Sequence, residues 1–189
     1  MRLARVAAGA LVGVAVLAGC SSKEPASETL PTPSPTAAAS EALPPLGPAD
    51  FPMPAEAREK TPAGAEAFLR YFMTLYNAAE ASLDPTYMDA FSQNCETCDQ
   101  LIQNLKEDAE SGYTYEGGIV TITAVSSPSL NGLSAETAFS MEQTALTVRD
   151  GQQAPLAHLS APAANLNCGA IFVWSQSEST WIFSQWDVN

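Results

Sequence analysis

Several features that would indicate a familiar activity are scarce in this chain of 189 residues. There is a single histidine, His158, which argues against histidine-rich metal sites and serine–histidine–aspartate catalysis. Lysine and arginine total 8 against 21 acidic residues, for a formal net charge of −13. Such a surface repels a polyanion, so nucleic acid is not an expected partner. No phosphate-binding glycine loop, nucleophile elbow or His-Glu-x-x-His motif occurs, and we expect neither a metal nor a cofactor.

The N-terminus carries an apolar run that is too short to span a bilayer. Arg2 and Arg5 precede residues 6–17, which have no charged or polar side chain. As a helix this run would be about 18 Å long, against roughly 30 Å of membrane hydrocarbon. A basic start, a short apolar core and small residues after it are typical of a secretory signal. We therefore expect residues 1–19 to be a signal peptide.

Leu17-Ala18-Gly19-Cys20 follows directly and resembles the bacterial lipobox, whose cysteine receives a diacylglycerol group. The resemblance implies that Cys20 is the lipidated N-terminus, held by palmitate-type chains on the extracytoplasmic face of the cell membrane. An ordinary signal peptide that ends near a cysteine is the alternative. Cleavage before Cys20 removes Arg2 and Arg5 and leaves 6 basic against 21 acidic residues. That balance disfavours docking on an anionic leaflet, so the lipid is expected to hold the protein at the membrane.

Residues 20–58 have the composition of a disordered tether. Nine of the 14 prolines lie there among alanine, serine, threonine and glutamate, and Phe51 is the only aromatic residue. Such a segment buries too little apolar surface to offset the entropy of ordering it. A semi-extended spacer between membrane and domain is the expected role; a proline-rich ligand for a partner domain is the alternative.

The pattern from Thr61 onward predicts three helices followed by four strands. Thr61-Pro62 is a helix start, and apolar residues then recur at spacings of three and four as far as Leu83. A second helix over 85–91 and a third over 96–111 follow, and Gly112 is suited to end the third. Strands are expected at 119–125, 136–149, 170–174 and 181–188, with a β-bulge near Gln143-Thr144. This order predicts an α+β fold.

The same order resembles the cystatin-like cone of the nuclear transport factor 2 superfamily. Three segments resemble more closely an actinobacterial family of lipoproteins of unknown function: Thr61-Pro62-Ala63-Gly64-Ala65-Glu66-Ala67-Phe68, Cys95-Glu96-Thr97-Cys98 and Tyr115-Glu116-Gly117-Gly118. The resemblance covers Phe51 to Asn189. It implies that residues 59–189 form three N-terminal helices packed on a curved antiparallel four-stranded sheet, and it implies no reaction.

Cys95 and Cys98 form the one motif with redox potential. Their place at a helix start favours a thiolate, but the flanking Glu96 and Asp99 oppose it, and no βαβ unit precedes the pair. We therefore predict a structural disulfide in an oxidising compartment. A thiol–disulfide protein acting through this pair is the alternative. Cys168 is expected to be a small buried residue.

A ligand site is expected between the first helix and the concave face of the sheet. Its predicted walls are large side chains: Phe72, Tyr76, Met141, Trp174 and Trp186. Asp89 and the tyrosine hydroxyls would be its few polar groups. The carboxylates expected on solvated helix faces are Glu66, Glu80, Glu107, Asp108 and Glu110. The competing expectation is that these large side chains pack the cone solid.

The function expected from these features is a non-catalytic binding or interaction module, not an enzyme. Its partner would be an envelope protein or an unspecified ligand. An enzyme of the cone fold that uses Asp89 as a base is a further alternative, supported by analogy of fold alone.

Overall fold

The computed structural model describes residues 43–189, and the segment Leu43–Asn189 forms a compact unit of its own. The expected signal peptide, Cys20 and the greater part of the expected tether lie outside the described residues. Within residues 43–189, no helix is both long enough and apolar enough to cross a bilayer.

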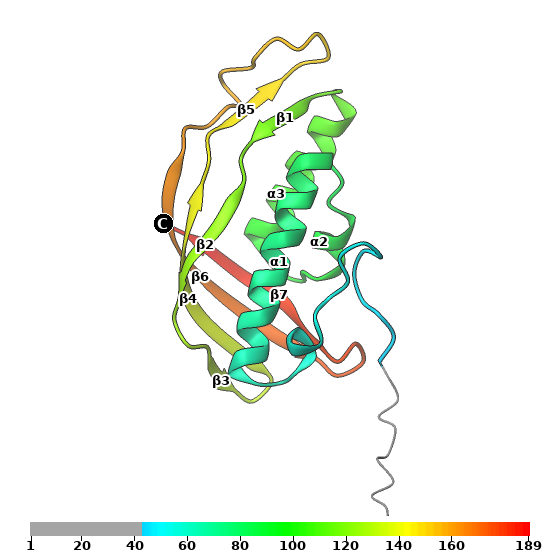
Figure 1. The fold of residues 1–189 in the computed structure, drawn as a ribbon, viewed down its shortest axis with the longest axis vertical. Coiled ribbons are helices and arrows are strands. Elements are labelled where there is room, and N and C mark those ends of the chain that lie inside the picture. Colours follow the sequence, from blue (N-terminus) through cyan, green and yellow to red (C-terminus); the bar gives the residue numbers. More distant parts are fainter. Residues whose placement is uncertain (1–42) are drawn as a thin grey trace, which may run out of the picture. The chain divides into compact units, whose positions relative to one another are not determined.

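The helices come first in the chain and the strands follow, as the α+β prediction requires (Figure 1). The elements are η1 (Ala55–Arg58, a 3-10 helix), α1 (Pro62–Ser82), α2 (Thr86–Ala90), α3 (Glu96–Glu110), β1 (Thr114–Gly117), β2 (Val120–Val125), β3 (Ser129–Asn131), β4 (Ser134–Gln143), β5 (Leu146–Arg149), β6 (Ala164–Ser175) and β7 (Thr180–Val188). All strand pairs between these elements are antiparallel.

The strands form two sheets, where the sequence predicted one sheet of four strands. The larger sheet has five strands in the order β2-β4-β6-β7, with the short β3 also paired to β4. β1 and β5 form a separate two-stranded sheet. β3 was missed because its three residues are all exposed and carry no alternating pattern.

The start of α1 depends on the Thr-Pro-Ala-Gly sequence. The Thr61 hydroxyl accepts a hydrogen bond from the Gly64 amide at 2.9 Å, and Pro62 stands at the first helical position. A Cβ at Gly64 would lie 2.1 Å from the Glu59 carbonyl oxygen, so the preceding chain can pass this close only because residue 64 has no side chain. α1 ends where Leu83 adopts a left-handed conformation, with φ of 54°.

Near Gln143-Thr144 the sequence predicted a β-bulge, but the structure has a break there instead. The break interrupts both strands of a long ribbon, in which β1 and β2 run along β5 and β4. β4 ends at Gln143 and β5 begins at Leu146. Across the ribbon, Gly117 and Gly118 have φ of 82° and 74°, and a Cβ at Gly117 would lie 2.0 Å from the Ala145 carbonyl oxygen. The two glycines therefore let the ribbon bend and pass from one sheet to the other. A change in which alternate positions are apolar marks such a site in the sequence. It does not show whether the site is a one-residue bulge or a break between two strands.

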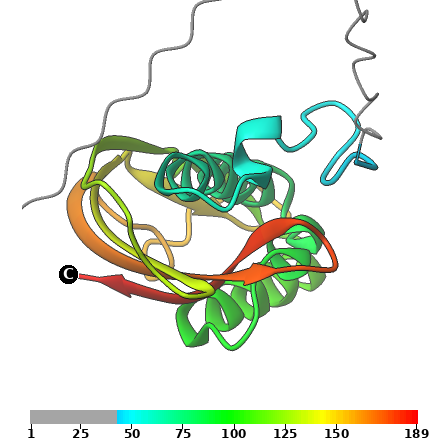
Figure 2. The ribbon, with the colours of Figure 1, turned by 90° about the horizontal axis from the view of Figure 1, so that it is seen from below.

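The core lies between α1 and the curved five-stranded sheet. Figure 2 shows α1 inside the curve of the sheet, and α3 packs against β7. Aromatic rings fill the contact: Phe72 lies 4.5 Å from Phe183 between ring centroids, and Phe172 lies 4.9 Å from Phe183. After α2, the chain also bonds to the edge of β7, since the Phe183 amide donates to the Phe91 carbonyl at 2.9 Å.

Residues 43–58 pack on the domain, although their composition predicts part of a tether. Met53 and Ala57 are buried in the core. Arg58 donates from Nη1 to the Pro44 carbonyl at 2.5 Å and from Nη2 to the Glu178 carbonyl at 2.8 Å, in the turn between β6 and β7. A few apolar residues between the prolines are enough to anchor this segment to the domain. The overall composition of the segment does not reveal them. The compact unit therefore begins near residue 43 and not near residue 59.

Candidate functional site

A pocket of about 500 Å³ opens where α1 and α3 meet the sheet and the β1–β5 ribbon. We call it the Glu80 pocket. Its lining includes Tyr76 and Glu80 from α1; Leu101, Leu105, Glu107 and Asp108 from α3; Tyr115 from β1; and Met141, Leu146, Leu166 and Trp186 from the strands beyond. Small-molecule sites in proteins commonly have this size and this mixture of apolar walls with a few polar groups.

Glu80 is the most unusual residue of this pocket. Its side chain belongs to the interior, with 5% of the residue exposed, and its Oε2 atom has no hydrogen-bond partner within residues 43–189. Burial raises the pKa of the Glu80 carboxyl, and the nearby Asp108 adds to the rise, while a hydrogen bond from Tyr76 opposes it. The expectation of a solvated Glu80 is therefore wrong. The sequence did contain a signal for its burial, because Glu80 lies one helical turn after Tyr76 on the apolar stripe of α1.

Two tyrosine hydroxyls accompany the buried carboxyl. The Tyr115 hydroxyl donates to Asp108 Oδ2, and burial together with this bond raises the pKa of Tyr115. Burial and the neighbouring Glu80 raise the pKa of Tyr76 in the same direction. Both tyrosines therefore stay protonated near neutral pH and line the pocket as neutral side chains. Tyr115 and Asp108 were not predicted as site residues, because nothing in their spacing shows that the Tyr115 hydroxyl reaches Asp108.

Three of the five predicted wall residues line the pocket, namely Tyr76, Met141 and Trp186. The rings of Tyr76 and Trp186 meet edge to face, with centroids 5.8 Å apart. Phe72 does not line it: the side chain is fully buried between α1 and the sheet, one helical turn before Tyr76. Trp174 lies elsewhere, on a second hollow beside Asn94, and packs edge to face on Trp181 at 5.1 Å.

Asp89, the base of the alternative enzyme, does not line the Glu80 pocket. Its side chain is 56% exposed and its Oδ2 lies 3.1 Å from Lys106 Nζ in a surface ion pair. The helix that carries it, α2, has only five residues, and of these Met88 is the one that is buried. Asp89 is therefore a surface residue, and the carboxyl group that enters the pocket beside Tyr76 is Glu80.

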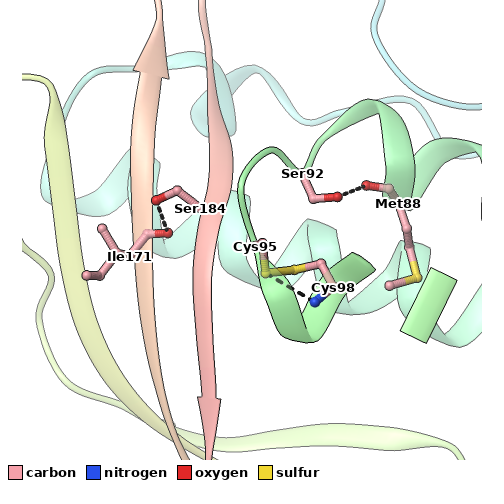
Figure 3. Close-up of a disulfide and its surroundings, with 6 residues drawn as sticks. All are labelled: Met88, Ser92, Cys95, Cys98, Ile171 and Ser184. Atoms are coloured by element: carbon pink, nitrogen blue, oxygen red, sulfur yellow. Dashed lines mark hydrogen bonds between the residues drawn. A yellow bond between two sulfur atoms is a disulfide. The ribbon is translucent and has the colours of Figure 1, made fainter. Parts of the chain in front are cut away.

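Cys95 and Cys98 form a disulfide at the start of α3, with an S–S distance of 2.07 Å (Figure 3). Both residues are fully buried, and Cys95 Sγ accepts a hydrogen bond from the Cys98 amide at 3.2 Å. Cys168 is also buried, with no disulfide partner among residues 43–189, and burial raises the pKa of its thiol. Among residues 43–189 there is no group of three or more side chains suited to hold a metal ion.

Comparison with solved structures finds similar chains of low sequence identity. A nuclear transport factor 2-like superfamily protein from Salmonella enterica is 9% identical with a TM-score of 0.43; the match covers 67% of this chain and 91% of that one. A conserved protein from Planctomyces limnophilus is 10% identical with a TM-score of 0.42, covering 65% and 93%. The comparison with curated proteins found no match. Residues 48–186 match a family described as a family of unknown function, DUF6318. The match spans most of the chain, and the protein therefore belongs to the DUF6318 family.

Proposed function

We propose that this protein is a cell-envelope lipoprotein, anchored to the membrane through Cys20, whose domain binds a small molecule in the Glu80 pocket without transforming it. The anchor rests on the sequence Leu17-Ala18-Gly19-Cys20 after a short apolar run. The binding role rests on the pocket itself.

The observation that carries the binding role is an unsatisfied polar group in a partly apolar pocket. Glu80 Oε2 is buried without a hydrogen-bond partner in the described residues, and it belongs to a pocket of about 500 Å³ with leucine, methionine and tryptophan in its walls. An unpaired buried polar atom costs roughly 1–3 kcal/mol. A bound molecule that offers a hydrogen-bond donor to Glu80 would offset that cost and fill the hollow.

The two alternatives have less support. The exposed ion pair of Asp89 with Lys106 puts the candidate base on the surface. The cysteine pair is fully buried, whereas thiol exchange needs an accessible sulfur. Both observations favour a binding protein over an enzyme or a redox carrier.

The binding role is tested by blocking the pocket. Leu101, half-buried on α3, lines the Glu80 pocket, and Leu101→Trp should fill part of it. Leu130→Trp is the matched control, because Leu130 is exposed on β3 and does not line this pocket. Native mass spectrometry of protein from its own envelope should find a co-purifying small molecule in the wild type and the control, but not in Leu101→Trp. A molecule retained equally by all three would contradict the proposal, and turnover of that molecule would contradict its non-catalytic part.

The anchor is tested separately. Wild-type protein should incorporate labelled palmitate and sediment with membranes, whereas Cys20→Ala should incorporate none. Palmitate incorporated by Cys20→Ala would show that the lipobox interpretation is wrong. Cys168→Ala is the control, since this thiol is buried and should not affect labelling.

A further inference from the structure

The Glu80 pocket has carboxyl groups and no basic group to balance them. Glu80, Glu107 and Asp108 line it, and the lining contains no lysine, arginine or histidine among residues 43–189. The chain as a whole carries a net charge of −13, so its field also favours a cation over an anion. A carboxylate or phosphate ligand would meet like charges on the helical side of the pocket without a compensating cation.

Aromatic rings stand beside these carboxyl groups. Tyr76, Tyr115 and Trp186 line the same pocket, and Tyr76 and Trp186 are in edge-to-face contact. Aromatic faces attract cations through their quadrupole, and combinations of aromatic rings with carboxylates are a recurrent means of holding organic ammonium groups. The strands also contribute the apolar side chains of Met141, Leu146 and Leu166, which would accept a hydrocarbon body.

Glu80 supplies a second, independent observation. Its Oε2 is an acceptor without a donor within residues 43–189, and 95% of the residue is removed from solvent. The Tyr115 hydroxyl is already donated to Asp108, so it does not serve Glu80. Gly118 lies next to this oxygen, since a Cβ there would be 3.5 Å from Oε2, but it offers no side-chain donor. A ligand N–H group that reached this carboxylate would satisfy the atom.

We propose that the Glu80 pocket binds a protonated amine with an apolar body, its ammonium group donating to the Glu80 carboxylate beside Tyr76 and Trp186, and its hydrocarbon part lying on Met141, Leu146 and Leu166. This inference rests on the proposed small-molecule binding and adds the chemical class of the ligand.

Binding in this form pairs the ammonium ion with the Glu80 carboxylate. The titratable groups that face Glu80 are Tyr76 on α1, Asp108 on α3 and Tyr115 on β1, and the tyrosines remain neutral. Burial alone favours a neutral Glu80 carboxyl, whereas the positive charge of an ammonium ion favours the carboxylate with which it pairs. A neutral alcohol of the same size forms no such ion pair.

The test uses three probes that differ only in the head group: hexylammonium, hexanol and hexanoate, titrated calorimetrically into the purified full-length chain near neutral pH. We expect hexylammonium to bind at least about tenfold more tightly than hexanol, a difference of about 1.4 kcal/mol, and hexanoate to bind most weakly. Tryptophan fluorescence should change with the first two probes, since Trp186 lines the pocket. Hexanol binding as tightly as hexylammonium would overturn the inference.

Variants separate this inference from the proposed function. Glu80→Gln should abolish the preference for hexylammonium over hexanol, and Glu80→Asp, which keeps the charge, should retain part of it. Glu66→Gln is the matched control, because Glu66 lies on the same helix in an exposed ion pair with Arg70. A preference that survives Glu80→Gln overturns the assignment of the ammonium group to Glu80. A further outcome is that the wild type binds all three probes equally and Leu101→Trp weakens the binding of each by the same factor. In that case the pocket binds small molecules but the amine class is wrong. If Leu101→Trp changes none of them, the proposed function fails as well.

Discussion

Glu80 shows how one carboxyl group links the stability of the domain to pH. Burial raises its folded-state pKa above the ordinary value of 4.5, so in the interval between the two values the folded chain holds more protons than the unfolded chain. The free energy of unfolding therefore falls as pH rises through that interval. Below it, the carboxyl is protonated in both states and the penalty disappears.

We therefore expect Glu80→Gln to gain stability over the wild type as pH rises from about 4 to about 8. The gain should be about 1.4 kcal/mol for each unit by which folding raises the Glu80 pKa. Urea denaturation at several pH values measures it, with Glu66→Gln, which replaces an exposed carboxylate paired with Arg70, as the control. A stability difference for Glu80→Gln that stays constant across this range would contradict the prediction.

Gly117 tests the break in the ribbon. It has φ of 82°, and a Cβ there would lie 2.0 Å from the Ala145 carbonyl oxygen. Gly112 has a similar φ of 70° but no atom within 4 Å of an added Cβ, so it isolates the cost of backbone conformation. We expect Gly117→Ala to lower the free energy of unfolding by at least about 1 kcal/mol more than Gly112→Ala, as measured by urea denaturation. Equal losses would show that the close approach relaxes freely.

At the scale of elements, the helices were predictable because their ends are encoded locally. Thr61-Pro62 starts α1 and Gly112 follows α3, and both signals depend only on neighbouring residues. The division of the strands into two sheets was not predictable, because it depends on which distant segment pairs with β5. In the candidate site, Tyr76, Met141 and Trp186 follow from their size and pattern. The contact of Asp108 with Tyr115 depends on how the chain turns between α3 and β1, which spacing alone does not reveal.

The disulfide fixes the junction at which α3 begins. Cys95 caps α3 and is bonded to Cys98, and both side chains pack in the core. We expect the double variant Cys95→Ala/Cys98→Ala to lose on the order of 2 kcal/mol of unfolding free energy, since the short covalent loop and the sulfur cap are both removed. Reductant should destabilise the wild type and Cys168→Ala but leave the double variant unchanged. Destabilisation of the double variant by reductant would assign the effect to another group.

At the scale of the whole domain, residues 43–58 are part of the folded unit. Met53 and Ala57 are buried, and Phe51 and Leu46 pack against the core. A chain that begins at residue 59 should therefore lose roughly 2 kcal/mol or more relative to one that begins at residue 43, because at least one large apolar side chain leaves the interior. Urea midpoints of the two chains measure the difference. Equal midpoints would show that this segment packs without stabilising the domain.

The contacts of Arg58 also have a mechanical consequence. Its guanidinium group joins the Pro44 carbonyl, at the beginning of the compact unit, to the Glu178 carbonyl in the turn between β6 and β7. Tension applied to the chain at Leu43 would therefore load this side chain and the β6–β7 hairpin before it reached the first turn of α1. The hairpin lies in the middle and at the edge of the larger sheet, where many ladder hydrogen bonds share a load. Arg58 thus gives a force on the N-terminal side a route into the β6–β7 hairpin that bypasses the first turn of α1.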